Sequence, residues 1–298
     1  MTDNLKGAIF IVISCGFIAA TSAIAKNLGM DGGADLHPLQ VSFGRFLFGF
    51  LTLVPFAIIK RPSFEGARWS RHMGRVFFGW AGVSGMFAAV ALMPLANATA
   101  ISFLSPFFAM ILAILFLGER AGPWRWGAAA IAFSGVVVLT QPGTDAFQPT
   151  ALIALMAAMF MGTELVFIKS LTGNEPPLRI LLINNGAGAV LSGCAAAFFW
   201  EPVSAPQWVM LAAIGTVMVT AQSFFLRGMK LGEANYVAPF MYTTLLYAAL
   251  YGMLFFGEIP SLATFAGAVL ILTGAAILGW RERRAGAKEP IATPFPDR

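Results

Sequence analysis

Long apolar segments alternate with short polar ones along almost the whole chain. An α-helix rises 1.5 Å per residue, so about 20 apolar residues cross the roughly 30 Å hydrocarbon core of a bilayer. The pattern predicts ten such helices, at residues 7–28, 37–59, 76–93, 96–117, 126–139, 150–168, 180–200, 208–226, 234–256 and 262–280. It therefore indicates an all-α integral membrane protein that lies in a lipid bilayer.

The composition of the 298 residues agrees with a membrane location. Hydrophobic residues make up 58% and charged residues 11%, against about 25% charged residues in a typical soluble domain. The net charge of +5 does not indicate nucleic-acid binding, because the basic residues are scattered among short loops. Cys15 and Cys194 lie inside apolar segments, and His37 and His72 are isolated at segment ends. We therefore expect no disulfide, no metal site and no cofactor.

Basic residues concentrate in alternate loops, which predicts the orientation in the membrane. Cytoplasmic loops retain positive charge, and the loop of residues 60–75 holds five Lys and Arg residues. If this loop is cytoplasmic, both termini are too, and 17 of the 19 basic residues lie on that side, all but Lys26 and Arg45. We expect a multi-pass protein of a bacterial-type inner (plasma) membrane. The charged, proline-containing residues 283–298 are expected to be a disordered cytoplasmic tail.

The chain contains an internal repeat with an offset of 139 residues. The sequence "FLGE" ends the fourth predicted helix at Glu119, and "FFGE" ends the ninth at Glu258. Each half holds five predicted helices, and because five is odd, the second half crosses the membrane in the opposite sense. We therefore expect two inverted five-helix repeats, at residues 5–141 and 148–282, around a central cavity. Such repeats are typical of secondary transporters that work by alternating access, although a duplicated scaffold without transport would have the same pattern.

The two Gly-Glu endings are expected to close tight helical hairpins. Gly118 and Gly257 can adopt the left-handed conformation that ends a helix. Glu119 and Glu258 come just before the next helix, whose N-terminal dipole favours a carboxylate. Inversion would place Glu119 toward the cytoplasm and Glu258 toward the opposite side.

Small residues and prolines mark candidate contacts and hinges. Gly79, Gly82 and Gly85 recur every three residues and form one stripe, which suits close helix packing or sliding. Pro106 and Pro239 lie inside the fourth and ninth predicted helices. They are candidate hinges, because proline removes a backbone hydrogen bond.

Three segments resemble EamA-type members of the drug/metabolite transporter superfamily. They are "VSFGRFLFGFLTLVP" in the second predicted helix, "ATAISFLSPFFAMILAILFLGE" in the fourth and "APFMYTTLLYAALYGMLFFGE" in the ninth. The resemblance spans about residues 5–282. It implies ten helices in two inverted repeats around a central cavity, and carrier-type movement of small organic molecules.

The resemblance leaves two kinds of transport open. Many similar proteins look like exporters of amino acids or other metabolites. The segments "MGTELVFIKSL" and "LHPLQVSFGRFLF" are instead similar to bacterial carriers that take up S-adenosylmethionine or riboflavin. The expected partners are a small-molecule solute and the bilayer, with protons as a candidate coupling ion. No catalytic constellation and no P-loop occur, so we expect neither an enzyme nor an ATP-driven pump.

Two charged residues inside predicted helices are the first candidates for a site. Arg45 lies about eight residues into the second helix, roughly 12 Å deep, where a charge needs a partner or water. It can bind a carboxylate or phosphate of the substrate, or it can be structural, bonding helix-end carbonyls or an acid. Glu164 in the sixth helix can couple protons or bind an amino group. The alternatives are an ion pair with Arg45 and a solvated residue at the cytoplasmic mouth.

Polar and aromatic residues of neighbouring helices extend this candidate site. Asn184 and Asn185 occupy the repeat position of Arg45, so the second half has amides where the first has a charge. For each residue, packing or interhelical hydrogen bonding is the alternative to substrate contact. The other candidates are Trp80, Ser84, Gln222, Ser223, Tyr242, Thr243 and Tyr247.

Overall fold

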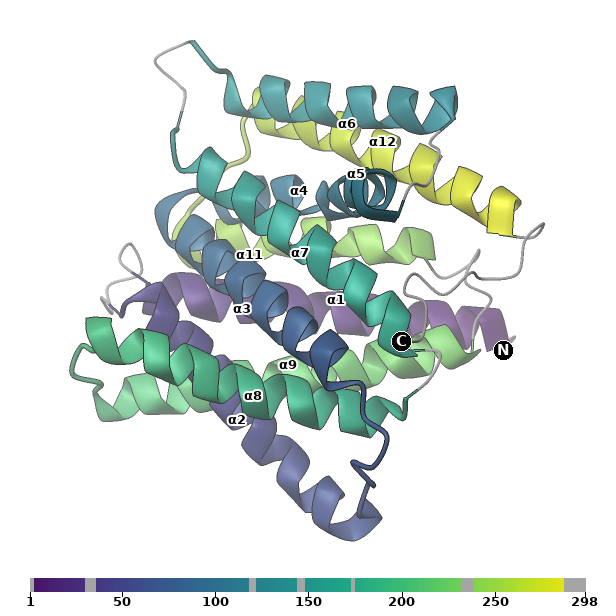
Figure 1. Ribbon diagram of the computed structural model, residues 1–298. Coiled ribbons are helices and arrows are strands. Elements are labelled where there is room, and N and C mark those ends of the chain that lie inside the picture. Colours follow the sequence, from purple (N-terminus) through teal and green to yellow (C-terminus); the bar gives the residue numbers. More distant parts are fainter. Residues whose placement is uncertain are drawn as a thin grey trace.

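A computed structural model describes residues 3–29, 36–117, 122–143, 148–172, 175–231 and 238–286 of the chain. Within these ranges the regular elements are all helices. They are α1 (Asp3–Leu28), α2 (Pro38–Lys60), α3 (Trp69–Leu92), α4 (Leu95–Ser102), α5 (Ser105–Leu117), α6 (Pro123–Thr140), α7 (Ala151–Thr172), α8 (Pro177–Ala196), η1 (Ala197–Phe199), α9 (Ala205–Leu231), η2 (Ala238–Tyr242), α11 (Thr243–Phe256) and α12 (Leu262–Gly286). The expected all-α fold is confirmed (Figure 1).

In the described ranges the helices form ten segments, of which α4–α5 and η2–α11 are each built from two pieces. In the described part of the chain, seven segments are by themselves long and apolar enough to cross a membrane. Many large apolar side chains point outward: Ile58, Val190, Leu246 and Phe265 are each about two-thirds exposed. Such a surface suits lipid rather than water, because the hydrocarbon core cannot solvate polar groups.

The 139-residue offset of the sequence reappears in the helix boundaries. α2 and α8 begin at Pro38 and Pro177, and α6 and α12 begin at Pro123 and Leu262. Proline at the start of a helix is favourable, because the first N–H groups lack a helical partner in any case. The two halves therefore share one architecture of five segments each.

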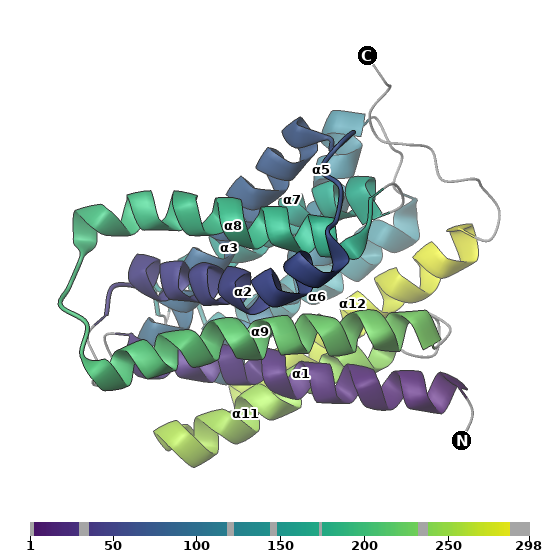
Figure 2. The same ribbon diagram turned by 90° about the horizontal axis from the view of Figure 1, so that it is seen from below.

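The packing of the helices follows the same two-fold relation. α1 packs against α9 and α11, and its equivalent α7 packs against α3 and α5. The pairs α2 with α8 and α6 with α12 are each formed by equivalent helices. α6 and α12 lie side by side at the top of Figure 1, and α1, α2, α8 and α9 form the layer seen from below in Figure 2. The molecule is thus two inverted five-helix repeats that interlock.

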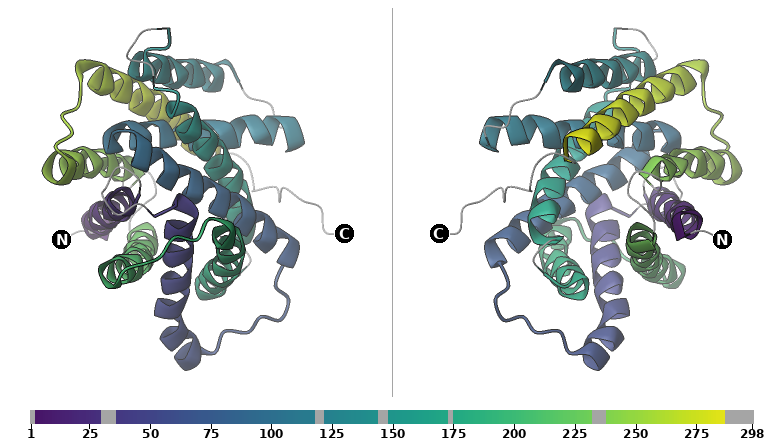
Figure 3. Two further views of the ribbon diagram at one scale, coloured as in Figure 1. Left: turned by 90° about the vertical axis from the view of Figure 1, so that its left-hand side faces the viewer. Right: turned by 90° about the vertical axis from the view of Figure 1, so that its right-hand side faces the viewer.

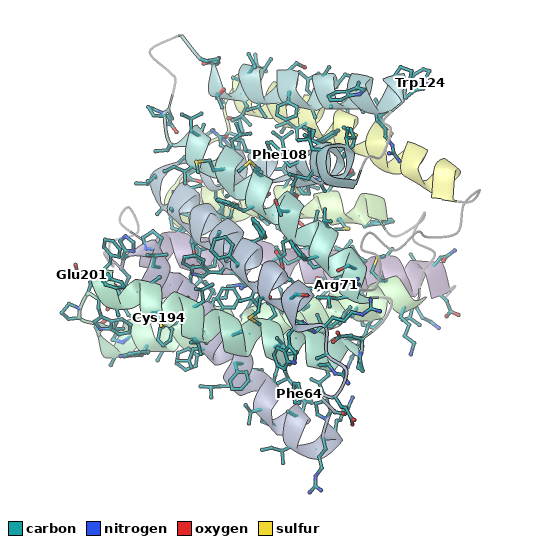
Figure 4. All side chains as sticks on the ribbon, in the orientation of Figure 1. Phe64, Arg71, Phe108, Trp124, Cys194 and Glu201 are labelled. Carbon is teal, nitrogen blue, oxygen red and sulfur yellow. The ribbon has the colours of Figure 1, made fainter. Side chains whose placement is uncertain are left out.

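Successive segments run between two ends of the bundle. The end with the N-terminus, called the N-terminal end below, also carries Arg71 and Trp124, whereas Glu201 lies at the opposite or far end (Figure 4). Figure 3 looks at the bundle from these two ends, so that α1 is seen end-on.

The fourth predicted helix is broken, so the expectation of one continuous helix over 96–117 is wrong. α4 ends at Ser102 and α5 begins at Ser105, with a turn between them. Pro106 is the second residue of α5, where a missing N–H costs little. Pro239 likewise lies in the short η2 that precedes α11. Each proline is therefore the second residue of a helical piece, next to the junction with the preceding segment, and not in a helix interior. A hinge motion at these junctions stays a prediction.

The glycine stripe on α3 is confirmed as a packing surface against α7. A Cβ atom at Gly79 would lie 2.8 Å from Glu164, one at Gly82 2.8 Å from Met161, and one at Gly85 3.1 Å from Ala157 Cβ. Contacts this short leave no room for side chains, so α3 and α7 approach each other closely along the stripe.

Candidate functional site

Two buried arginines and one glutamate whose side chain is 18% exposed form a charged group between α2, α3, α7 and α8. Arg45 on α2 and Arg75 on α3 are each 6% exposed. Arg75 Nε lies 3.5 Å from Glu164 Oε1 on α7, and Arg75 Nη1 donates to Ile180 O on α8 at 3.4 Å. Glu164 therefore has its ion pair with Arg75. The sequence pattern placed Arg75 in a loop, which is wrong because α3 begins seven residues earlier than predicted, at Trp69 rather than residue 76.

Arg45 is the charge of this group without an ion pair of its own. Glu164 and Arg75 both act on it electrostatically, and its guanidinium lies 4.5 Å from the ring centroid of Phe46. Its Nη1 is buried and has no hydrogen-bond partner among the described residues. Two guanidinium groups thus share one carboxylate, and burying such an excess charge is costly. A group that accepts hydrogen bonds from Arg45 would remove part of this cost.

Gly79 makes the space in which the Glu164 carboxylate lies. A Cβ atom at this position would be 2.8 Å from both Cδ and Oε1 of Glu164. The carboxylate therefore fits over the glycine on the α3 surface and meets Arg75 from there.

Three further candidates have buried polar atoms without a partner in the described part of the chain. These atoms are Trp80 Nε1 on α3, Asn184 Oδ1 on α8 and Gln222 Oε1 on α9. α2 packs against α3, α8 and α9, so Arg45 and these three side chains come from α2 and from helices that contact it. Buried polar atoms nearly always have a hydrogen-bond partner. His72 Nδ1, Arg75 Nε and Arg179 Nε, which belong to the charged groups of α3 and α8, are further atoms of this kind among the described residues. Arg45, Trp80, Asn184 and Gln222 are therefore candidates for contacts with a polar ligand.

Three other predicted residues have partners within the helices. Ser84 Oγ bonds Ser42 Oγ at 2.8 Å and joins α3 to α2. Asn185 donates to Leu181 O at 2.9 Å and fills the space above Gly49, so it supports the α2–α8 contact. Ser223 Oγ donates to Val219 O on its own helix and is exposed. Ser84 and Asn185 therefore serve helix packing, and Ser223 bonds its own helix.

The three candidates from the ninth span lie in a different layer. η2 and α11 pack against α1, and α11 also packs against α4. The Tyr242 ring contacts Phe103 at 5.5 Å between centroids, Thr243 Oγ1 donates to Phe240 O, and Tyr247 covers Gly16. The structure therefore does not bring them together with Arg45.

Glu258 stabilises the start of a helix, but not of the helix that was expected. Gly257 has the left-handed conformation (φ 64°) that ends α11, as predicted. Leu95 is the first residue of α4, and its N–H donates a hydrogen bond to the carboxylate of Glu258 at 2.8 Å. The sequence had instead predicted that Glu258 stabilises the start of the helix that follows it, α12. Its other oxygen lies 3.0 Å from Lys26 Nζ. Gly118 and Glu119, the equivalent pair, lie outside the described residues.

A second charged cluster lies at the N-terminal end, near Arg71 in Figure 4. His72 Nε2 and Glu175 Oε2 are 2.7 Å apart and almost fully buried, and Arg179 Nη1 lies 3.7 Å from the same oxygen. Arg68 N–H donates to Glu175 Oε1 at 2.9 Å. Burial alone would raise the pKa of Glu175, but the hydrogen bonds from Arg68 and His72 and the charges of His72 and Arg179 hold it below its ordinary value. Glu175 therefore links the start of α3 to the turn before α8.

Among the described residues, no three His, Cys, Asp or Glu side chains are arranged to hold a metal ion.

A family model for EamA-like transporters matches the chain twice, over residues 5–141 and 148–280. The chain belongs to the EamA-like transporter family. The resemblance on which the sequence interpretation rested is confirmed, and so is the transporter class.

Relatives of this EamA chain carry several names. The riboflavin transporter of Rhizobium johnstonii is 35% identical over 95% of this chain and 93% of its own length. The S-adenosylmethionine uptake transporter of Rickettsia felis is 27% identical over 97% of this chain and 99% of its own. A pseudopaline exporter of Pseudomonas aeruginosa is 27% identical over 91% and 95%, respectively. A solved crystal structure with 19% identity covers 95% of this chain and 98% of its own with a TM-score of 0.60, which supports the fold alone.

Sequence reasoning missed several polar contacts of this EamA chain. Arg75 was placed in a loop and His72 at a segment end, and Glu175 was not considered, yet all three are buried between α3, α7 and α8. One signal was available: "SRHMGR" can continue the α3 helix toward its N-terminus, because it contains neither proline nor a turn motif. Lys26 was noted only as an exception to the charge rule, and its pairing with Glu258 explains the exception.

Proposed function

We propose that this protein is a secondary carrier that takes up a cofactor-like organic solute, with riboflavin as the first candidate substrate. The observation that carries the proposal is that Arg45, Trp80, Asn184 and Gln222, on α2, α3, α8 and α9, each have a buried polar atom without a partner among the described residues. The substrate class comes from the relatives, of which the Rhizobium johnstonii riboflavin transporter is 35% identical. No chemical change of the solute is involved.

The site chemistry suits a flat heteroaromatic ring with many hydrogen-bond acceptors. Arg45 presents a planar array of donors, and the Trp80 indole adds one donor and a surface for stacking. Asn184 and Gln222 each offer both a donor and an acceptor. The ring system of riboflavin has carbonyl oxygens and ring nitrogens along one edge, which these donors can bind, and N–H and hydroxyl groups for the amide oxygens.

S-adenosylmethionine is the second candidate substrate, because Arg45, Arg75 and Glu164 provide both positive and negative charge. Its carboxylate would bind Arg45, and its ammonium or sulfonium would approach Glu164, which Arg75 holds at 3.5 Å. Relatives named for its uptake match nearly the full chain, as in Rickettsia felis.

Transport is proposed to proceed by alternating access between the two repeats. Contacts between the repeats occur at both ends of the bundle: Gln40 exchanges hydrogen bonds with the Glu201 backbone at the far end, and His72 bonds Glu175 at the N-terminal end. A carrier would break one set at a time. By the distribution of basic residues, we place both termini in the cytoplasm and the chain in a plasma membrane, with Glu164 as the candidate for proton coupling.

The test is uptake of labelled riboflavin, S-adenosylmethionine and amino acids into proteoliposomes, with and without a proton gradient. We expect saturable riboflavin uptake that Arg45→Met abolishes. Arg227→Met, which removes an exposed arginine from α9, serves as the matched control and should transport normally. Saturable uptake of S-adenosylmethionine but not riboflavin would favour the second candidate, and absence of flux for the whole panel would refute an uptake carrier of this class.

A further inference from the structure

Lys26 and Glu258 form a saturated network at the far end of the bundle. Lys26 is 5% exposed, and its ammonium has three acceptors: Glu258 Oε1 at 3.0 Å, Val90 O at 2.7 Å and Met93 O at 3.0 Å. The second oxygen of Glu258 accepts from Leu95 N–H. An ammonium has three protons to donate, so every one of them is used.

This network joins the two repeats at one point. Lys26 belongs to α1, its carbonyl acceptors end α3, and Leu95 begins α4, all in the first repeat. Glu258 lies in the second repeat, between α11 and α12. The pair therefore binds three elements of one repeat to the turn of the other.

The packing of α1 and α3 at this end breaks the two-fold relation of the fold. A Cβ atom at Gly29 would lie 2.6 Å from Ala91 Cβ, so the far ends of α1 and α3 are in direct contact. The equivalent helices α7 and α9 meet at most marginally in the described part of the chain, although the other major contacts of α1 and α7 correspond. In an inverted-repeat carrier, such a difference between equivalent contacts is what distinguishes the closed end from the other.

The surroundings of the pair allow it to open. A pocket of about 280 Å³ adjoins it, lined by Glu258, Met93, Pro94 and residues of α4, α6, α7 and α12. The Glu258 side chain is 17% exposed. Breaking a fully buried ion pair is strongly unfavourable, but water that enters from this pocket can solvate the separated charges.

We propose that the Lys26–Glu258 pair is the lock that keeps the far end of the transport path closed, and that it breaks when the carrier opens at that end. The inference rests on the proposed carrier function, since it assigns the lock to one step of alternating access. It also predicts that the double exchange Lys26→Glu with Glu258→Lys does not restore the lock. A carboxylate at position 26 would face the carbonyls of Val90 and Met93, and an ammonium at position 258 would face Leu95 N–H.

The test measures opening directly and needs no substrate. Ser84 is 8% exposed and lies where α3 packs on α2. It is eight residues, or about 12 Å, from the far end of α3 at Leu92, so a reagent from that side reaches it only when the helices separate there. Ser84→Cys is introduced after Cys15 and Cys194 are replaced by alanine. Labelling by a membrane-impermeant maleimide is then followed in right-side-out and inside-out vesicles.

We expect Lys26→Met to raise the labelling rate from the far end about fivefold or more, the lower limit of usual conformational coupling. Lys230→Met, which removes an exposed lysine from the last turn of α9, should leave the rate unchanged. If Lys26→Met does not fold, Glu258→Gln is the second variant, since its amide oxygen still accepts from Leu95 N–H. A folded variant of either kind that labels at the unmodified rate would overturn the lock. Failure of the unmodified protein to transport any solute would instead overturn the carrier proposal, because the labelling result does not depend on substrate.

Discussion

Gly79→Ala is expected to impair transport while the fold stays intact. The new Cβ atom would lie 2.8 Å from Cδ and Oε1 of Glu164 and 3.1 Å from Oε2. Carbon atoms in contact are about 3.5 Å apart, so the carboxylate has to move by roughly 0.7 Å. It is the far end of a flexible side chain, and it can move without a shift of either helix.

The magnitudes separate the effect on stability from the effect on transport. Alanine in a helix interior is about 1 kcal/mol more favourable than glycine, and forcing Glu164 from its rotamer costs about 0.5–1.5 kcal/mol. The two nearly cancel, so the melting temperature should change little. A displacement of roughly 0.7 Å leaves the carboxylate within reach of Arg75, which now lies 3.5 Å away, so the folded state loses little of this ion pair. Uptake is more sensitive, because a hydrogen bond between the displaced carboxylate and the solute or coupling proton contributes about 1.5–3 kcal/mol, which corresponds to a roughly ten- to hundredfold loss of uptake.

The assay combines thermal unfolding of the purified protein with solute uptake into proteoliposomes. Gly82→Ala is the matched control on the same stripe, because its Cβ would lie 3.1 Å from the backbone nitrogen of Met161. That contact pushes the helices apart at a cost of about 1–3 kcal/mol, so this variant should melt lower. Full uptake by Gly79→Ala at an unchanged melting temperature would refute a role for the carboxylate position. A loss of stability equal to that of Gly82→Ala would refute the separation of the two effects.

Three further predictions concern other parts of the molecule. Arg45→Met should abolish uptake yet keep or raise the melting temperature, because replacing an uncompensated buried charge by an apolar group is often stabilising; a lower melting temperature would indicate a structural arginine. Glu175→Gln should destabilise the protein at neutral pH, since the pKa of Glu175 lies below its ordinary 4.5 in the fold. The difference from the unmodified protein should vanish as the pH falls below 4.5 through that lower pKa, and a difference that persists in acid would contradict the assignment. Gly135→Ala places a Cβ atom 2.7 Å from Gly267 O, so it should lower the melting temperature. The solute concentration for half-maximal uptake should stay the same, and a change in it would place the α6–α12 contact in the transport path.

The features that could be predicted from sequence are those set by local composition. Apolar segment lengths located the spans, and the two Gly-Glu endings and the 139-residue offset revealed the repeat. Helix starts were less certain, because a hydropathy pattern ends where charges begin, whereas α3 continues through Arg71 and Arg75. Arg75 can be buried because Glu164 of α7 meets it, and Arg71 donates a hydrogen bond to the carbonyl of Ser170 on α7.

The candidate site was predicted in part. Arg45 was named because a charge inside an apolar helix is costly, and Asn184 because it occupies the repeat position of Arg45. Trp80 and Gln222 were named as polar or stacking groups on neighbouring helices. All four have buried atoms without a partner among the described residues. Tyr247 is likewise a residue with a polar group inside an apolar segment, but its side chain packs on α1. Which face of a helix meets which neighbour depends on contacts far apart in the chain, and a single sequence does not contain them.

The sequence by itself determined that the protein is a helical membrane protein with two inverted halves. Hydropathy locates the helices, and an odd number of spans in each half requires the inversion, so neither depends on contacts between distant residues. The tertiary structure decided which charges pair. Glu258 serves the start of α4, which is distant in sequence, and Lys26 meets it there. In a medium of low polarity each buried charge must find a partner, and only the packing of the two repeats decides which partner is near.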